Sequence, residues 1–165
     1  MGYTDGIMKT ILAPIDFSPI TDRVCSAAAS LAKAVGGRLI LLHSVAPPVV
    51  TSEYAPMVEN IAEISAASEE AAAKRMMRLQ KKLQDRLVVV ECMQFYGAPV
   101  PYILEQAKEL SADYIVMGSH GHTALYDLLA GSTAHGVLRK APCPVLIVPA
   151  VIKAAKKVAA RGRAG

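Results

Sequence analysis

Apolar residues follow two alternating patterns along this chain: short continuous runs, and longer stretches in which they recur every three or four positions. Short runs that are rich in β-branched residues and bounded by Gly, Pro or charge are typical of strands buried on both faces. Five such runs lie at residues 10–15, 38–45, 86–93, 114–118 and 144–149. Their alternation with helical stretches predicts an α/β fold, a single parallel sheet with helices on both faces.

The first helical stretch has signals for both of its ends. Its apolar positions recur through residues 20–35, and the Gly36-Gly37 pair follows. Ser18 is the predicted N-cap, with Pro19 at the first helical position, where its missing N–H leaves no hydrogen bond unmade. We therefore expect a helix from Pro19 to the glycine pair.

Two further helices are predicted downstream. Residues 57–83 carry one apolar stripe, with acidic residues toward the start and basic residues toward the end, as the helix dipole favours. Residues 99–110 carry a second stripe. Ahead of the longer helix, three prolines within residues 46–56 break the periodicity and indicate an exposed loop.

Length and composition favour a single soluble domain. The chain has 165 residues, and no window of eighteen or more is free of Gly, Pro and charge, so no membrane span is expected. The first residues do not resemble a secretory signal, which makes the cytoplasm the expected location. Cys25, Cys92 and Cys143 are odd in number and far apart, so we expect buried, reduced thiols instead of a disulfide framework or a zinc site.

The net charge of +4 is concentrated at the C-terminus. Residues 150–165 hold five basic side chains and no acid, which leaves 13 basic against 14 acidic side chains in residues 1–149. We therefore expect a domain over residues 1–150 and a basic tail over 151–165. A solvated extension is favoured over a polyanion-binding arm, and no nucleic-acid partner is expected.

The predicted topology indicates where a ligand would bind. In parallel sheets, ligands bind beyond the carboxyl ends of the strands, where the strand order reverses. The corresponding loops are residues 15–18, 44–47, 94–98 and 118–123. Asp16, in the first of these loops, is either a turn-former or a ligand contact.

The segment 117–133, "MGSHGHTALYDLLAGST", carries three spaced glycines. Gly118 follows a strand directly, Gly121 precedes a short helical stretch, and Gly131 precedes Ser132, the predicted N-cap of another helix. Two helix starts near one strand end would expose unpaired N–H groups, which bind anions. The alternative is purely structural, a strand-to-helix turn followed by a helix break. The spacing matches neither the P-loop nor the dinucleotide fingerprint.

The sequence offers no pattern of catalytic or metal-binding side chains. Ser119 precedes His120, but no third group is placed to orient a base beside a nucleophile. His43 lies within an apolar run and is expected to be a hydrogen-bonded core histidine. His120, His122 and His135 lack the i, i+4 pairing of a helical zinc site, so no metal held by protein ligands is expected.

Several motifs in order give the chain a family resemblance. The spacing Gly118, two residues, Gly121, nine residues, Gly131-Ser132 is similar to the nucleotide-binding signature of the universal stress protein family. "ILAPIDFS", "LILLHSV", "GAPVPYILEQAKELSADYIVMGSHG" and "PCPVLIVP" support it. The resemblance spans about residues 8–149.

The resemblance implies a Rossmann-like adenine-nucleotide-binding fold with strand order 3-2-1-4-5, a homodimer paired through the final strand, and ATP, ADP or AMP bound with Mg²⁺ at the strand ends. Asp16 would accept from the ribose hydroxyls, and the glycine segment would surround the phosphates. The full implied contact set comprises Pro14, Ile15, Asp16, Ser44, Val45, Met117, Gly118, His120, Gly121, His122, Gly131, Ser132 and Thr133. Thr133 and Ala134 depart from the family pattern, in which a hydrophobic residue is followed by a hydroxyl residue, so one phosphate contact is expected to be lost or to move by one position.

The resulting hypothesis is an ATP-binding regulator that senses nucleotide state in the stress response without turnover. One alternative is slow ATP hydrolysis or phosphotransfer, with His120, His122 or Asp16 assisting a water molecule. This alternative is disfavoured because phosphoryl transfer needs charge neutralisation, and no Lys or Arg lies near the glycines. The other alternative is a nucleotide-independent dimeric scaffold.

Overall fold

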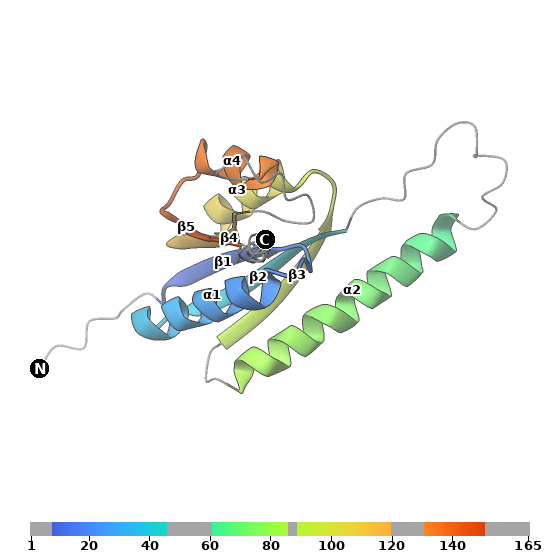
Figure 1. Ribbon diagram of the computed structural model, residues 1–165, viewed down its shortest axis with the longest axis horizontal. Helices are drawn as coiled ribbons and strands as arrows, with labels where there is room; N and C mark the ends of the chain where they lie inside the picture. Colours follow the sequence, from blue (N-terminus) through green and yellow to red (C-terminus); the bar gives the residue numbers. More distant parts are fainter. Residues whose placement is uncertain (1–7, 46–60, 86–88, 120–130, 151–165) are drawn as a thin grey trace, which may run out of the picture.

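The computed structural model describes residues 8–45, 61–85, 89–119 and 131–150, with the backbone alone for residues 61 and 62. These residues form five strands and four helices (Figure 1). In chain order the elements are β1 (Thr10–Ile15), α1 (Thr21–Val35), β2 (Arg38–Val45), α2 (Ile61–Gln84), β3 (Val89–Tyr96), α3 (Pro99–Glu109), β4 (Tyr114–Gly118), α4 (Ser132–Leu138) and β5 (Val145–Val148). The alternation predicted from the sequence is confirmed.

The five strands form one parallel sheet in the order β3-β2-β1-β4-β5. This is the strand order that the family resemblance implied. The order reverses beside β1, whose neighbours are β2 on one side and β4 on the other. Because all the strands are parallel, their carboxyl ends meet at one edge of the sheet.

Helices cover both faces of the sheet, with α1 and α2 on one face and α3 and α4 on the other (Figure 1). Successive residues of a strand point to opposite faces. In β1, Ile11 and Ala13 join the core under α1, whereas Leu12 joins the core under α3 and α4. Both faces are therefore buried, as the continuous apolar runs predicted.

The start of α1 differs from the prediction. The N-cap is Ile20, without a side-chain cap, and the buried Ser18 hydroxyl has no hydrogen-bond partner among the described residues. The chain makes a separate turn first: Ser18 N–H donates to Asp16 Oδ1 at 3.0 Å, and Thr21 N–H donates to the Ser18 carbonyl at 3.0 Å. This turn delays the helix past Pro19, so both start signals were wrong. The end signal is confirmed, because Gly36 caps α1 in the left-handed conformation.

The apolar stripe of α2 is buried along only part of the helix. Ala72, Met76 and Leu83 are buried, whereas Ile64 is 55% exposed. A helix of 24 residues is about 36 Å long, and an eight-residue strand is about 26 Å long. The first turns of α2 therefore extend beyond the sheet (Figure 1). Residues 57–60 of the predicted helix and the predicted loop 46–56 lie outside the described residues.

Strand β3 ends later than predicted, at Tyr96 instead of residue 93. It pairs with β2 through Val45↔Tyr96 at the carboxyl end. As an edge strand it alternates there between buried Phe95 and exposed Tyr96, so the continuous apolar run ends before the strand does. The predicted residues 86–88 lie outside the described residues.

The three cysteines are free thiols, as expected, but only Cys25 is fully buried. Burial raises the pKa of the Cys25 thiol to about 12 and that of Cys92 to about 11. Among the described residues, no three His, Cys, Asp or Glu side chains lie close enough together to hold a metal ion. Within the same residues, no helix is both long and apolar enough to cross a membrane.

Candidate functional site

A pocket opens at the carboxyl edge of the sheet, where the strand order reverses. Its walls come from the ends of β1, β2, β3 and β4 and from the starts of α1, α3 and α4. We call this the strand-end pocket; it is lined by Pro14, Ile15, Asp16, Ile20, Thr21, Val24, Leu42, Ser44, Phe95, Pro99, Ile103, Met117, Gly118 and Thr133. Its volume is about 160 Å³. Most of the lining side chains are apolar, and a few polar groups converge among them, as in small-molecule sites.

The structure brings together about half of the residues that the resemblance implied. Those in the wall of the pocket are Pro14, Ile15, Asp16, Ser44, Met117, Gly118 and Thr133. Val45, Gly131 and Ser132 are described but do not line it, and the Val45 side chain is buried. His120, Gly121 and His122 lie outside the described residues, as does the short helix predicted after Gly121.

Asp16 follows β1 directly, and its carboxylate has one clear local role. Oδ1 accepts the Ser18 N–H at 3.0 Å, which makes Asp16 a turn-former. Asp16 is nevertheless exposed and lies in the wall of the strand-end pocket. The two alternatives that the sequence left open are therefore geometrically compatible, since a carboxylate has further acceptor sites.

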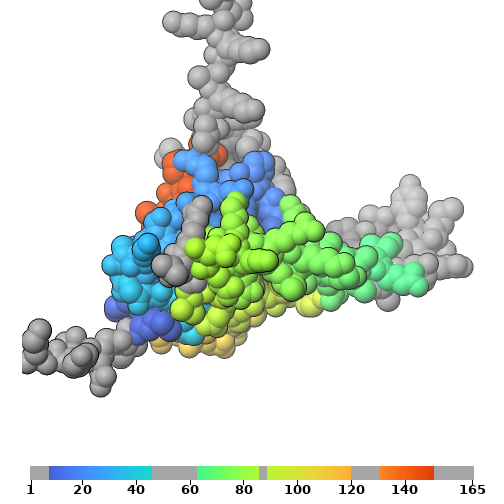
Figure 2. Space-filling model, turned by 90° about the horizontal axis from the view of Figure 1, so that it is seen from below, coloured from blue at the N-terminus to red at the C-terminus, as the bar shows by residue number. Residues whose placement is uncertain are grey.

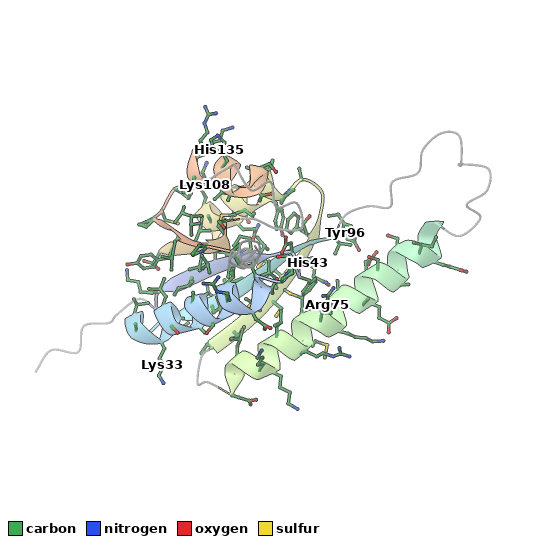
Figure 3. All side chains as sticks on the ribbon, in the orientation of Figure 1. Lys33, His43, Arg75, Tyr96, Lys108 and His135 are labelled. Atoms are coloured by element: carbon green, nitrogen blue, oxygen red, sulfur yellow. The ribbon has the colours of Figure 1, made fainter. Side chains whose placement is uncertain are left out.

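His43 is the hydrogen-bonded histidine that the sequence predicted. Its Nδ1 lies 2.9 Å from the Ile15 carbonyl oxygen, and because that oxygen only accepts, Nδ1 donates. Burial lowers the pKa of His43 below its ordinary value, which favours the neutral ring. The Phe17 ring packs against it, with centroids 4.3 Å apart, and the Arg75 guanidinium lies 4.4 Å from the Phe17 centroid. Figure 3 labels Arg75 and His43, which lie close together on the α2 side of this edge.

The start of α4 lies one residue earlier than predicted. Gly131 is the N-cap, and exposed Ser132 is the first helical residue without a capping hydrogen bond. Gly131 N–H donates to the Ser119 carbonyl at 2.5 Å, and this bond ties the start of α4 to the end of β4. At φ −63° and ψ 165°, Gly131 has an extended backbone that any residue adopts, so its conformation does not require glycine. The first N–H groups of α4, at Ser132 and Thr133, have no acceptor within the helix.

Sequence reasoning missed the pocket residues that lie away from the strand-end loops. Thr21 in the first turn of α1 is 93% buried, and its hydroxyl has no partner among the described residues. Ile103 comes from α3. No local signal distinguishes Thr21 and Ile103 from other core residues, since only the packing of the helices brings them to this edge. Phe95, near the end of β3, falls within the predicted strand-end segment 94–98, although no contact role was assigned to it.

Comparison with known proteins identifies relatives along almost the whole domain. Residues 8–149 match the Universal stress protein family. The universal stress protein YxiE of Bacillus subtilis is 33% identical over 148 residues, covering 86% of this chain and 99% of that protein. A universal stress protein of Thermus aquaticus is 32% identical over 147 residues, with the same coverage of 86% and 99%.

Solved structures share the fold. That of MJ0577, a universal stress protein of Methanocaldococcus jannaschii, has a TM-score of 0.74 at 30% identity and covers 88% of this chain and 98% of that one. A universal stress protein in complex with cAMP has a TM-score of 0.57 at 24% identity, covering 86% and 97%. One from Archaeoglobus fulgidus in complex with dAMP has a TM-score of 0.58 at 22% identity, covering 85% and 96%. At these last two identities the likeness is one of fold.

Proposed function

This chain belongs to the universal stress protein family, and from that premise we propose that it binds an adenine nucleotide in the strand-end pocket. We propose further that the nucleotide is ATP, bound with Mg²⁺, and that the protein acts in the cytoplasm as a nucleotide-dependent regulator of a stress response. One observation carries the proposal: a largely apolar pocket with the Asp16 carboxylate in its wall lies where the strand order reverses.

The pocket residues suit the chemistry of a nucleoside. Ile15, Leu42 and Met117 offer apolar surface to a purine ring, and Asp16 offers an acceptor to ribose hydroxyls. The volume of about 160 Å³ is below the roughly 300–1,000 Å³ of sites that enclose a whole small molecule. We therefore expect the base and part of the ribose inside, with the phosphates at the rim near Thr133.

Two proteins of the same fold support an adenine nucleotide as the ligand class, because they have been solved with cAMP and dAMP. Apart from Asp16, the described wall of the pocket contributes no carboxylate to a metal. The phosphates and water would thus supply most of the oxygen ligands of Mg²⁺, as is usual for this ion at nucleotide sites.

The pocket favours binding over turnover. Its described wall holds no Lys, Arg or His, and phosphoryl transfer depends on positioning and on neutralising the charge that develops on the phosphate oxygens. A site with that wall is suited to hold a nucleotide while a partner responds to its presence.

Isothermal titration with ATP, AMP and GTP tests the proposal. Asp16→Asn should weaken ATP binding roughly tenfold or more, because a hydrogen bond to a charged group contributes about 1.5–3 kcal/mol. Asparagine can still accept from Ser18 N–H, so the turn should persist. The control is Asp85→Asn, an exposed carboxylate outside the pocket wall, which should bind like the wild type.

Two results would contradict the proposal. One is the absence of ATP affinity up to millimolar concentrations in folded protein that carries no co-purified nucleotide. The other is equal affinity in Asp16→Asn and the wild type. Phosphate release by the same samples should remain at the level of buffer alone, and release above it would favour slow hydrolysis.

We also propose that two copies pair through β5. This strand is at the edge of the sheet, hydrogen-bonded only to β4 among the described residues, and Leu146 on it is 45% exposed. An apolar edge strand favours pairing with another chain. Light scattering at low micromolar concentration should show a dimer that Leu146→Glu dissociates. Met77→Glu, at a residue of α2 that is 66% exposed, is the control. A monomeric wild type, or equal masses for the two variants, would contradict this pairing.

A further inference from the structure

A second hollow lies between the start of α1 and the C-terminal half of α2. Figure 2 shows this face of the molecule, with α2 in green beside α1 in blue. We call it the α1–α2 groove. It is lined by Phe17, Ser18, Pro19, Thr21, Asp22, Arg75, Arg78, Leu79 and Lys82, and its volume is about 310 Å³. Apart from Thr21, none of these residues lines the strand-end pocket. The groove is therefore a separate feature that shares one wall with that pocket.

The groove has an excess of positive charge. Arg75, Arg78 and Lys82 recur at intervals of three and four residues, which places them on one side of α2. Asp22 is the single carboxylate in the described wall, and it pairs with Lys82 Nζ at 3.0 Å. Neither arginine has a carboxylate within ion-pair distance among the described residues. Within the described ranges, the two guanidinium groups thus have no counter-charge.

Each arginine can donate to an anion. Arg75 Cζ lies over the Phe17 ring, 4.4 Å from its centroid, and this cation–π contact occupies none of the five N–H donors in a hydrogen bond to a protein acceptor. A planar fork of N–H donors matches the oxygens of a phosphate group. The contact with Phe17 also restricts the Arg75 side chain, which reduces the entropy lost when it binds.

The α1 side of the groove holds two hydroxyls that lack partners. Ser18 is 4% exposed and Thr21 is 7% exposed, and neither hydroxyl oxygen has a hydrogen-bond partner among the described residues. A buried polar group without a partner costs about 1–3 kcal/mol, so such groups call for an explanation. Both lie at the uncapped start of the 15-residue helix α1, whose dipole attracts negative charge. A bound anion would supply the missing acceptor.

We propose that the α1–α2 groove is a second anion site that binds a phosphate group between the Arg75 and Arg78 guanidiniums and the start of α1. Ser18 and Thr21 donate to it after a rotation about their side-chain bonds. The phosphate comes either from a separate phosphorylated compound or from the nucleotide in the adjoining pocket. The site itself does not depend on nucleotide binding, because Ser18 and both arginines lie outside the strand-end pocket.

A titration with inorganic pyrophosphate at low ionic strength tests the proposal. Binding is followed by NMR through the backbone amide resonances of isotope-labelled protein. The amides of Ser18, Thr21 and Asp22 report the groove, and those of Ser132 and Thr133 report the start of α4. The groove amides should shift in a saturable manner. Arg78→Gln should raise the Kd read from them at least fivefold, and Arg75→Gln with Arg78→Gln at least tenfold.

The matched control is Lys81→Gln, which removes one charge from an exposed residue of α2 outside the groove and should change the Kd by less than twofold. Ser18→Ala should weaken binding severalfold without lowering the urea midpoint of unfolding, because it removes a hydroxyl that is unpaired in the unliganded protein. Groove amides that do not move, or an equal Kd in Arg78→Gln and Lys81→Gln, would overturn the site.

A parallel titration with ATP identifies the source of the phosphate. If the double arginine variant loses pyrophosphate affinity but keeps its ATP affinity, the groove binds a separate phosphorylated compound. If it loses both to the same extent, the groove holds the phosphates of the nucleotide, and these do not lie at the rim near Thr133. A protein that fails to bind ATP at all but shows the groove shifts would refute the proposed nucleotide function and leave the anion site intact.

Discussion

Gly118→Val should weaken ATP binding at least a hundredfold while leaving the protein folded. Gly118 is the last residue of β4 and lies in the wall of the strand-end pocket, opposite Val148 in the register with β5. A valine there places three more carbons in a cavity of about 160 Å³. If the base is excluded from that cavity, the loss of binding free energy should exceed roughly 2.7 kcal/mol, which corresponds to a hundredfold change in Kd.

The fold should survive because nothing about the backbone at Gly118 demands glycine. The positive-φ glycines among the described residues are Gly36 and Gly97, so Gly118 has a backbone that valine can adopt, and β-branched residues favour strands. Isothermal titration gives the affinity, and far-ultraviolet circular dichroism with a urea titration checks the fold. Ala34→Val, at an exposed position of α1, is the control for the added carbons. Wild-type affinity in Gly118→Val would place the ligand elsewhere.

Gly37→Ala should lower the free energy of unfolding by about 3 kcal/mol, the upper range for an overpacked core. A Cβ at Gly37 would lie 2.4 Å from the Lys9 carbonyl oxygen and 2.9 Å from Ile11 Cδ1. The carbonyl cannot move away easily, since it accepts the Arg38 N–H at 2.7 Å where β2 begins beside β1. The added methyl must therefore displace the pairing of the two central strands.

Gly36→Ala is the matched control, with the same added methyl at the neighbouring residue. Gly36 has φ +64°, and no atom lies within 4 Å of the position its Cβ would take. Its substitution should therefore lower the free energy of unfolding by only about 1–2 kcal/mol, because alanine is less stable than glycine in the left-handed conformation. Urea unfolding of both variants measures the difference. A larger loss in Gly36→Ala than in Gly37→Ala would show that backbone conformation, and not space, limits this turn.

This glycine pair illustrates what local sequence can and cannot reveal. The sequence predicted correctly that a helix ends at Gly36-Gly37, because an apolar stripe that stops at glycine is a local signal. The sequence could not show that Gly37, in contrast to Gly36, has no room for a side chain. That restriction comes from the Lys9 carbonyl, and Lys9 is distant in sequence. The predicted capping roles of Ser18 and Ser132 were also wrong. A local turn on Asp16 delays the start of α1, and the bond from Gly131 N–H to the Ser119 carbonyl fixes the start of α4 one residue earlier.

The residues of the strand-end pocket also include some that the sequence predicted and some that it did not. The rule that ligands bind at strand ends, together with the family motif, pointed to Asp16, Ser44, Gly118 and Thr133, which the structure gathers in one pocket. These residues come together because parallel strands bring their carboxyl ends to one edge whatever the side chains are. Ile103 joined the pocket only through the packing of α3 on the sheet.

By itself, the amino-acid sequence determined the alternation of strands and helices, the parallel sheet buried on both faces, and the edge of the sheet at which the strand-end pocket lies. These follow from short-range periodicity and from a motif that is read along the chain. Only the tertiary structure decided where the helices begin, how far α2 extends beyond the sheet, and that residues 17–22 face residues 75–82 across a basic groove. Contacts between residues so far apart depend on how two helices pack on one sheet face, and no local pattern in the sequence encodes that packing.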